Sequence, residues 1–514
     1  MQIILTTCNA RFSHTALSLR LLRANLGELK ENSEIIEFNL KSDVYDAAVE
    51  LLSRHPSIVG ISVYIWNVDF CRQLVEILRN VDPGLYIVLG GPEIADVEHY
   101  ADDPLLKLAS CLIIGEGENA FRDVCEKVLA GNPVDKIIRA TPCDPLSIIL
   151  PYNEYSDEDI QHRIVYLETS RGCPYRCAFC LSAKDKPLRF FDLDTILREI
   201  DALYQRGVRS FKFLDRTLNA SLPRALLILR HFERYIAPDL SLHFEMVPHE
   251  IPEELLDELA KFPSPIIQIE FGVQTLNPSV ARLIHRPLNP ERLLENLRIL
   301  ESRTHTHVHA DLIAGLPDEN LESFAEGFNR LHQTGVQEIQ LGILKRLKSS
   351  PLTEKEKEWG LVFAPYAPYE ILKTPALSFE ELTSIKRFAK YWDTIVNNGN
   401  FPETSALILN HGDANCFANF MQFSEWIFAQ TNTTTAISLT RWVALLFQFL
   451  TEKMNENPEC AAMTILRDYL HARKEDIPPI LRPYIPADFK ISSVCQRMSN
   501  RSDKAHQRQQ KHIQ

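Results

Sequence analysis

Short apolar runs alternate with helical patterns over the first 145 residues. Four runs are apolar enough to form buried strands, at 3–7, 57–65, 85–91 and 111–118. Between two of them, residues 68–81 place apolar side chains at helical spacing. Strands that are apolar on both faces and alternate with helices predict an α/β fold with a doubly wound, Rossmann-like parallel sheet over 1–145. Such sheets bind ligands at the carboxyl ends of their strands.

The same alternation returns after residue 160 and continues to residue 354. Six apolar runs are each followed by a helical pattern, and they fall at 163–172, 208–215, 240–247, 266–274, 307–315 and 338–344. A complete barrel of this type needs eight strand–helix units. The pattern therefore predicts a partial (β/α)6 barrel over 161–354, and residues 146–160, which are acidic and contain proline, are the expected linker.

Strand patterns fade after residue 354. The segments 378–398 and 439–454 are helical in period, which predicts a mostly helical C-terminal domain over 355–496. Residues 497–514 are polar and basic with almost no apolar side chains, so we expect a disordered tail.

Composition and charge narrow the choice of partner and compartment. The net charge is -13, and outside the tail there is no long basic block, which argues against nucleic acid as an obligatory partner. No run of 18 apolar residues predicts a membrane span, and the first residues lack the pattern of a signal peptide. The 11 cysteines are odd in number and irregular in spacing, which favours a reducing cytoplasm over a secreted disulfide framework.

Three cysteines stand apart from the others. Cys173, Cys177 and Cys180 form a C-x-x-x-C-x-x-C pattern directly after the first predicted barrel strand, where barrel active sites form. A zinc site normally has four protein ligands, and no partner pair follows. Three thiolates can hold three irons of a 4Fe–4S cubane and leave the fourth iron open to another ligand. A structural metal site is the alternative.

This pattern, with the aromatic Phe179 before its third cysteine, resembles the motif of the radical S-adenosylmethionine (radical SAM) family. The resemblance implies that the open iron binds S-adenosylmethionine and that its reductive cleavage yields a 5′-deoxyadenosyl radical. The segment 270–275, "EFGVQT", resembles a strand of the larger radical SAM subgroups. Phe179, Glu245, Glu270 and Gln274 are the implied S-adenosylmethionine contacts, although the sequence does not separate the roles of the two glutamates.

The N-terminal domain resembles the cobalamin-binding domain that is joined to some radical SAM barrels. The resemblance is carried by four segments in the right order, "TTCNARFSHTALSLRLL", "VGISVYIWN", "VLGGPE" and "IIGEGE". It implies a cobalamin site formed by Ser62, Tyr64, Gly90, Gly91, Gly115, Glu116 and Gly117. None of His14, His55 and His99 lies in a D-x-H-x-x-G pattern, so no histidine is expected beneath the cobalt. An empty doubly wound fold or a nucleotide site is the alternative.

Together the two resemblances imply a cobalamin-dependent radical SAM methyltransferase that methylates an unactivated carbon through methylcobalamin. The implied partners are an organic substrate, a small metabolite or a peptide, and an external electron donor such as flavodoxin or ferredoxin. A rearrangement, cyclisation or oxidation without methyl transfer is the first alternative, and a sensor without turnover is the second. A methylthiotransferase fits less well, because the N-terminal domain has no second cysteine triad.

Other features of the sequence stay open. His305, His307 and His309 alternate and would share one face of a strand, either as a metal site or as ordinary polar positions of the barrel. No other catalytic residue can be named, and neither the substrate, the oligomeric state nor the role of the helical domain follows from the sequence.

Overall fold

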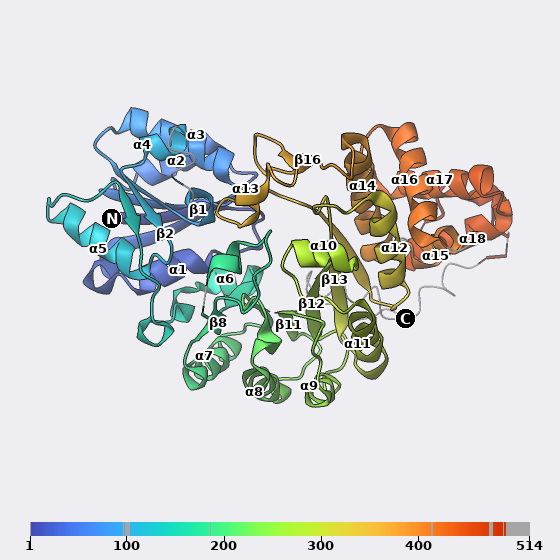
Figure 1. The fold of residues 1–514 in the computed structure, drawn as a ribbon, viewed down its shortest axis with the longest axis horizontal. Helices are drawn as coiled ribbons and strands as arrows, with labels where there is room; N and C mark the ends of the chain where they lie inside the picture. The colour runs from blue at the N-terminus through green and yellow to red at the C-terminus, as the bar shows by residue number, and fades with distance from the viewer. Residues whose placement is uncertain are drawn as a thin grey trace.

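The computed structural model describes residues 2–95, 97, 103–185, 187–412, 415–471, 476–486 and 488–489. Figure 1 shows three regions in chain order, an N-terminal sheet with helices on both faces, an open barrel, and a helical C-terminal region beyond the barrel. The predicted disordered tail at 497–514 lies outside the described residues.

The N-terminal region is a six-stranded parallel sheet with strand order β2-β1-β3-β4-β5-β6. Helices α2, α3 and α4 cover one face and α1 and α5 cover the other (Figure 1), which confirms the doubly wound prediction. The strands are β1 (Ile3–Asn9), β2 (Ser33–Asn39), β3 (Ile58–Ser62), β4 (Tyr86–Gly90), β5 (Cys111–Ile114) and β6 (Ile137–Arg139). The helices are α1 (Leu17–Ala24), α2 (Val44–Leu52), α3 (Val68–Val81), α4 (Pro104–Leu108) and α5 (Glu118–Leu129).

The central region is a second six-stranded parallel sheet, ordered β14-β13-β12-β11-β10-β7, with β7 and β14 at its edges. This arrangement confirms the partial barrel. Its strands are β7 (Val165–Leu167), β10 (Ser210–Phe213), β11 (Ser241–Met246), β12 (Ile267–Gln274), β13 (His307–Ala314) and β14 (Glu338–Ile343). Its helices are α7 (Leu193–Gln205), α8 (Leu222–Glu233), α9 (Glu253–Leu259), α10 (Pro278–Leu283), α11 (Pro290–Arg303) and α12 (Leu321–His332), and α6 (Asp157–His162) precedes β7.

A short antiparallel pair stands at the mouth of the barrel. It consists of β8 (Ser170–Arg171) and β9 (Arg189–Phe190), with Arg171 opposite Arg189. The pair brackets residues 172–188, which include all three cysteines of the motif and which we call the cluster loop. The two strands fix the stems of this loop at the carboxyl end of β7.

The C-terminal region is mostly helical, as the sequence predicted. It contains α13 (Leu352–Lys355), a small pair β15 (Val362–Phe363) and β16 (Ile371–Lys373), and the helices α14 (Phe379–Trp392), α15 (Pro402–Leu409), α16 (Cys416–Thr431), α17 (Leu439–Gln448) and α18 (Pro458–His471). A continuous apolar core joins these helices to the barrel. Within the described residues, no helix has both the length and the apolar character that a bilayer span requires.

Candidate active site

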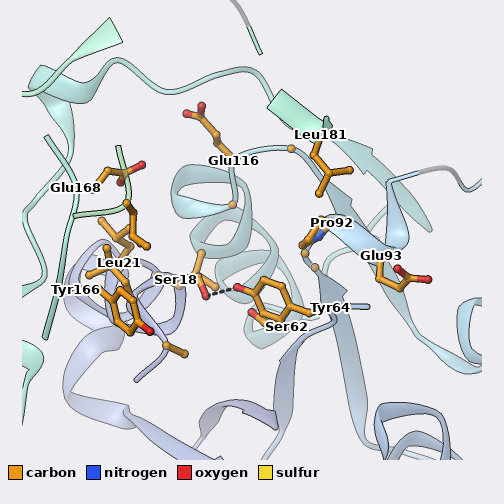
Figure 2. Close-up of a pocket in the computed structure, with 18 of the residues that line it drawn as sticks. Ser18, Leu21, Ser62, Tyr64, Pro92, Glu93, Glu116, Tyr166, Glu168 and Leu181 are labelled. Carbon is orange, nitrogen blue, oxygen red and sulfur yellow. Dashed lines mark hydrogen bonds between the residues drawn. The ribbon is translucent and has the colours of Figure 1, made fainter. Parts of the chain in front are cut away.

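A cavity of about 910 Å³ lies between the carboxyl edge of the N-terminal sheet and the mouth of the barrel. All seven residues that the sequence suggested for cobalamin line this cavity, namely Ser62, Tyr64, Gly90, Gly91, Gly115, Glu116 and Gly117. Figure 2 shows Ser62, Tyr64 and Glu116 from the N-terminal domain on the same cavity as Tyr166 and Glu168 from the barrel. The cavity therefore has walls from both domains.

Glycines form the N-terminal wall, and at Gly91 the backbone leaves no room for a side chain. Gly91 has φ +102° and ψ 170°, a conformation that is essentially restricted to glycine, and a Cβ atom would lie 2.5 Å from the carbonyl oxygen of Val63. At Gly90 a Cβ atom would meet only the carbonyl oxygen of Ile113, at 3.9 Å. The bare backbone thus leaves space for a bulky ligand, which fits the cobalamin expectation.

The loop after β3 is held by side chains at the cavity floor. The hydroxyl groups of Tyr64 and Ser18 are 3.0 Å apart, and the Tyr64 ring stacks on Trp66 with centroids 4.4 Å apart. The side-chain oxygen of buried Asn67 accepts a hydrogen bond of 2.7 Å from the backbone N–H of Tyr64. Asn67 also donates to the carbonyl oxygen of Cys8 at 3.0 Å, so it ties this loop to β1.

The cluster loop carries the three cysteines to the barrel side of the cavity. Gly172, which lines the cavity, has φ +88°, and a Cβ atom there would lie 2.8 Å from the carbonyl oxygen of Pro187 across the loop. Ala178 donates its N–H to the carbonyl oxygen of Ile284 at 2.9 Å, and Leu352 donates to the carbonyl oxygen of Ala178 at 2.8 Å. Both hydrogen bonds fix the middle of the loop against the barrel.

The three thiols fit a site that binds several irons better than a site for one ion. They do not form a group in which every ligand atom lies within 4.8 Å of the others, a statement that covers the described residues. Thiolates of a cubane bind separate irons, so a wider spacing is expected. Burial raises the pKa of the Cys177 thiol, whereas the charge and the hydrogen bond of Arg286 lower it. A guanidinium N–H of Arg286 donates to Cys177 Sγ at 3.4 Å.

The four residues suggested for S-adenosylmethionine have different surroundings. Glu245 lines the cavity, whereas Glu270, its register partner on the next strand, has Oε2 3.2 Å from His243 Nε2. Gln274 adopts φ +71° at a register shift in β12, and its buried Oε1 has no hydrogen-bond partner in the described part of the chain. A strained residue with an unused acceptor suits a ligand contact. Phe179 is half-buried against the apolar core.

The barrel lumen holds carboxyl groups whose pKa values are shifted in opposite directions. Although burial raises the pKa of Glu270, the hydrogen bond from His243 lowers it below its usual range. Burial and the nearby charge of Glu270 raise the pKa of Asp311 well above its ordinary value. Burial also raises the pKa of Glu245.

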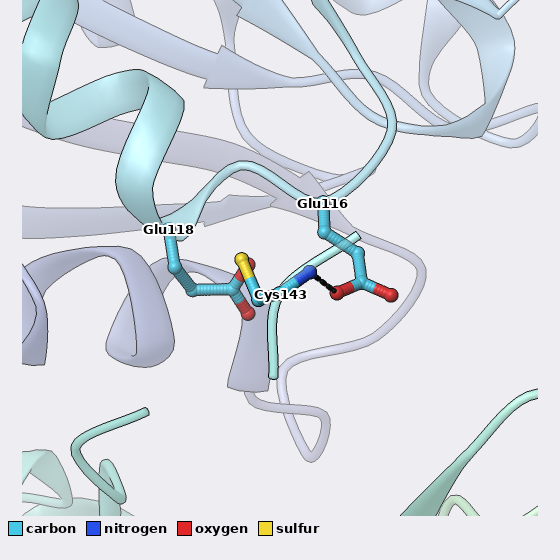
Figure 3. A group of neighbouring side chains, drawn as sticks. All are labelled: Glu116, Glu118 and Cys143. Carbon is cyan, nitrogen blue, oxygen red and sulfur yellow. Dashed lines mark hydrogen bonds between the residues drawn. The ribbon is translucent and has the colours of Figure 1, made fainter. Parts of the chain in front are cut away.

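Arg171 and Arg189, at the two ends of the cluster loop, contact the glycine loop that follows β5. Arg171 donates to Glu116 at 3.0 Å and to Glu118 at 2.5 Å, and Arg189 forms an ion pair with Glu116. Figure 3 shows Glu116, Glu118 and Cys143 with their potential ligand atoms close together, all within 4.8 Å. Because both carboxylates already accept from arginines and burial raises the pKa of the Cys143 thiol, this group is an ion-pair network with no need for a metal.

Two further contacts join the domains around the cavity. Lys348, which follows β14, forms an ion pair of 2.9 Å with Glu93 after β4, and both side chains are at most 5% exposed. On the other side, the hydroxyl group of Tyr166 hydrogen-bonds to Nδ1 of His14. His14 lines the cavity, His55 lies elsewhere in an exposed turn, and His99 is outside the described residues.

The alternating histidines do not form a metal site in the described structure. His307 Nε2 on β13 lies 2.8 Å from Glu338 Oε1 on the neighbouring strand β14, and His309 Nε2 lies 3.6 Å from Asp311 Oδ1. His305 precedes β13 and is exposed. Each histidine thus has its own surroundings.

Several residues of the site were not found by sequence reasoning. Arg171, Arg189, Lys348 and Asn67 contact partners that are at least three residues away and mostly in another domain. Single charged or amide side chains carry no spacing signal, so only the fold reveals these contacts. Among these residues, only Arg171 had a hint in the sequence, because it lies directly before Gly172 and Cys173.

Comparisons with known proteins agree with this geometry. Residues 167–331 match the family model of the radical SAM superfamily, and residues 4–125 match that of the B12 binding domain. Residues 357–513 match a family described as a protein of unknown function (DUF4080). The fold and the site thus define a protein with a radical SAM barrel and a B12-binding domain.

Similar proteins share both domains. The 2-(S-pantetheinyl)-carbapenam-3-carboxylate methyltransferase of Streptantibioticus cattleyicolor is 27% identical over 346 residues, which cover 59% of this chain and 49% of that protein. The structure of the cobalamin-dependent S-adenosylmethionine radical enzyme OxsB has a TM-score of 0.61 at 14% identity and covers 99% of this chain and 83% of its own. The radical S-adenosylmethionine methyltransferase TsrM of Kitasatospora setae has a TM-score of 0.56 at 16% identity and covers 71% of this chain and 76% of its own.

Residues 167–331 thus form a radical SAM domain, and residues 4–125 form a B12-binding domain. The radical SAM domain implies S-adenosylmethionine and a 4Fe–4S cluster, and the B12-binding domain implies cobalamin. The chain spans about half the length of the carbapenam methyltransferase that it matches, and the two structural likenesses are low in identity and show the fold.

Proposed function

We propose that this protein is a cobalamin-dependent radical SAM methyltransferase that methylates an unactivated carbon of an organic substrate. One observation carries the proposal. A single cavity is lined by the glycine loops of the B12-binding domain, by Gly172, Leu181 and Ser182 of the cluster loop, and by Glu245 of the barrel. A methyl carrier and a radical source must face one substrate atom, and a shared cavity allows this.

Each cofactor would be held by a separate set of residues. Cys173, Cys177 and Cys180 would bind the cluster, and Gly90, Gly91 and Gly115 would support cobalamin through backbone groups. Phe179, Glu245 and Gln274 would contact S-adenosylmethionine, with Glu270 beside them. When bound, the cluster supplies one electron to S-adenosylmethionine, and cobalamin supplies a methyl group. The chain's own task is to align these groups and to keep water out.

The position of Glu245 separates it from Glu270. Glu245 faces the cavity, and no side chain of the described residues forms an ion pair with it. Glu270 is already engaged by His243. We therefore assign the direct contact to Glu245 and a supporting role to Glu270, which would hold His243.

The partners and the compartment follow from the same proposal. The cluster needs an external one-electron donor, such as flavodoxin or ferredoxin. A cytoplasmic location is supported by the ten cysteines that the structure describes, because all of them are free thiols. The substrate is an organic molecule, either a small metabolite or a peptide.

The relatives also support one other reaction class. OxsB is described as a cobalamin-dependent S-adenosylmethionine radical enzyme without mention of methyl transfer. Our second candidate is therefore a radical rearrangement, cyclisation or oxidation that uses the same cofactors. The two classes differ in whether S-adenosylmethionine loses its methyl group.

The test is anaerobic reconstitution with iron, sulfide, hydroxocobalamin, S-adenosylmethionine and a chemical reductant. A methyltransferase should form 5′-deoxyadenosine and also S-adenosylhomocysteine, the demethylated product. A non-methylating enzyme should form only 5′-deoxyadenosine, and a sensor should form neither.

Two cysteine variants locate the chemistry. Cys177→Ala should abolish 5′-deoxyadenosine formation, because one iron loses its ligand. Cys460→Ala changes an exposed thiol far along the chain and should leave the rate unchanged. Equal rates in wild type and Cys177→Ala would refute the proposed cluster site.

A further inference from the structure

The stems of the cluster loop face each other with two arginines in register. In the pair β8–β9, Ser170 lies opposite Phe190 and Arg171 lies opposite Arg189. Arg171 precedes Gly172 and Cys173, and Arg189 ends the same loop. Any displacement of either arginine therefore moves one end of the segment that carries the three thiols.

Both arginines converge on one carboxylate of the other domain. Glu116 Oε2 accepts from Arg171 at 3.0 Å and from Arg189 at 3.1 Å, and Glu116 Oε1 forms a shorter ion pair with Arg189. The backbone N–H of Cys143 also donates to Glu116 Oε2 at 2.7 Å. The three charged side chains are at most 19% exposed, so water screens these contacts only weakly.

The same residue belongs to the wall of the cobalamin cavity. Glu116 stands between Gly115 and Gly117, and all three line the cavity. Figure 2 shows Glu116 among the side chains that line the cavity, together with Leu181 of the cluster loop. The backbone of residues 115–117 therefore faces the cobalamin site, while the Glu116 carboxylate holds the two ends of the cluster loop.

We propose that Glu116 is a positioning residue that couples the cobalamin site to the cluster site through Arg171 and Arg189. The inference rests on the proposed function, because both cofactors must bind. A glycine-flanked loop loses backbone freedom when a ligand lies against it. Ordering this loop also orders Glu116, and the two arginines transmit that order to the cluster loop.

Coupling of this kind is reciprocal, which makes it measurable without turnover. If bound cobalamin raises the affinity for S-adenosylmethionine by some factor, bound S-adenosylmethionine must raise the affinity for cobalamin by the same factor. We expect a factor on the order of 5 or more in the wild-type protein, at the lower end of typical allosteric couplings. Titrations of reconstituted protein with hydroxocobalamin and with S-adenosylmethionine, each with and without the other, give both factors.

Glu116→Gln is the decisive variant. Glutamine keeps the shape and one acceptor but removes the charge that both arginines share. We expect both cofactors still to bind, the reciprocal factor to fall to about 1, and the electron paramagnetic resonance spectrum of the reduced cluster to stop responding to cobalamin. If Glu116→Gln is poorly folded, Arg189→Gln removes one of the two links and should lower the factor partially.

Glu154→Gln is the matched control. Glu154 is also a buried carboxylate shared by two cations, Arg23 and Lys30, but it lies outside the cavity and the cluster loop. Its variant should keep the wild-type factor. A factor that persists in Glu116→Gln, or one that falls equally in Glu154→Gln, overturns the inference, whereas failure of either cofactor to bind the wild type overturns the proposed function instead.

Discussion

The barrel contacts a neighbour on each side, and the two interfaces are built from opposite chemistry. Toward the N-terminal domain the contacts are ion pairs, such as Arg20 with Asp159 at 2.8 Å and Lys348 with Glu93 at 2.9 Å. Toward the C-terminal helices the contacts are aromatic, since Phe328 of α12 packs against Trp392 of α14 with centroids 4.8 Å apart. The large cavity lies at the ion-paired interface.

Buried carboxyl groups show the same contrast. Although burial raises the pKa of Glu37 in the N-terminal domain, its ion pair with Arg20 lowers that pKa below its usual range. In the C-terminal region, burial raises the pKa of Asp468 to about 6, and its partners are the neutral Thr404 side chain and backbone N–H groups.

The difference indicates separate tasks for the two interfaces. An aromatic interface is held mainly by burial of apolar area and suits a permanent attachment. Ion pairs fix orientation strongly but contribute little net stability, because desolvation offsets much of the attraction. Such contacts suit the side of the barrel where two cofactor sites must be aligned.

The largest expected effect lies at the aromatic interface. Phe388→Ala removes a ring that contacts Phe328 of α12 with centroids 5.3 Å apart, and should cost about 4 kcal/mol of stability. Denaturant unfolding of the purified protein measures this loss. Phe379→Ala on the same helix changes a ring that is 53% exposed and should cost far less. Similar losses in both variants would contradict the aromatic interface.

At the ion-paired interface, removing one charge of a pair should cost more stability than removing both charges. Lys348→Met leaves Glu93 buried without its cation and should cost about 3 kcal/mol. The double variant Lys348→Met/Glu93→Gln removes both charges and should recover most of that loss. A double-mutant cycle on unfolding free energies measures the coupling. Additive losses would show that the pair does not act as a unit.

The raised pKa of Asp468 predicts a pH dependence for the C-terminal region. Because the folded pKa of about 6 exceeds the unfolded value, the folded state binds the proton more tightly, and stability falls as the pH rises from about 4 to 6. The full effect is roughly 3 kcal/mol. Asp468→Asn should flatten this slope in thermal unfolding measured across that range. The control Asp157→Asn changes an exposed carboxylate and should keep the wild-type slope.

The smallest effect on stability is expected at the glycine wall. Gly91→Ala places a Cβ atom 2.5 Å from the Val63 carbonyl oxygen in a conformation that alanine rarely adopts, at a cost of about 1–3 kcal/mol. It should also weaken hydroxocobalamin binding in an absorbance titration. Gly131→Ala is the matched control, since Gly131 also has a positive φ but no atom within 4 Å of an added Cβ. Equal cobalamin affinity in both variants would argue against the glycine wall.

Much of the fold was readable from local pattern. The helix α3 begins and ends where the apolar spacing of 68–81 indicated, and all six barrel strands lie within the predicted runs. Two strands of the N-terminal sheet were missed. β2 is mostly half-buried, and β6 is short and largely exposed at the sheet edge, so neither has the continuous apolar run that marks a buried strand.

The candidate site, like the fold, has parts that the sequence predicted and parts that only the structure revealed. Cysteine spacing pointed to the cluster loop, and the glycine loops that follow buried strands pointed to the cavity wall, because both signals lie within a few neighbouring residues. The separate roles proposed for Glu245 and Glu270 rest on which side chain lines the cavity and which one His243 engages, and residue order records neither.

The amino-acid sequence by itself determined the order of strands and helices, the three-cysteine loop and the positions where only glycine fits. Only the tertiary structure decided that Arg171 and Arg189 meet on Glu116, and that the two cofactor loops share one cavity. The physical reason is how far apart along the chain the interacting residues lie. Periodicity and short motifs arise from interactions between near neighbours, whereas an ion pair depends on where two distant segments come to lie once the apolar cores have packed.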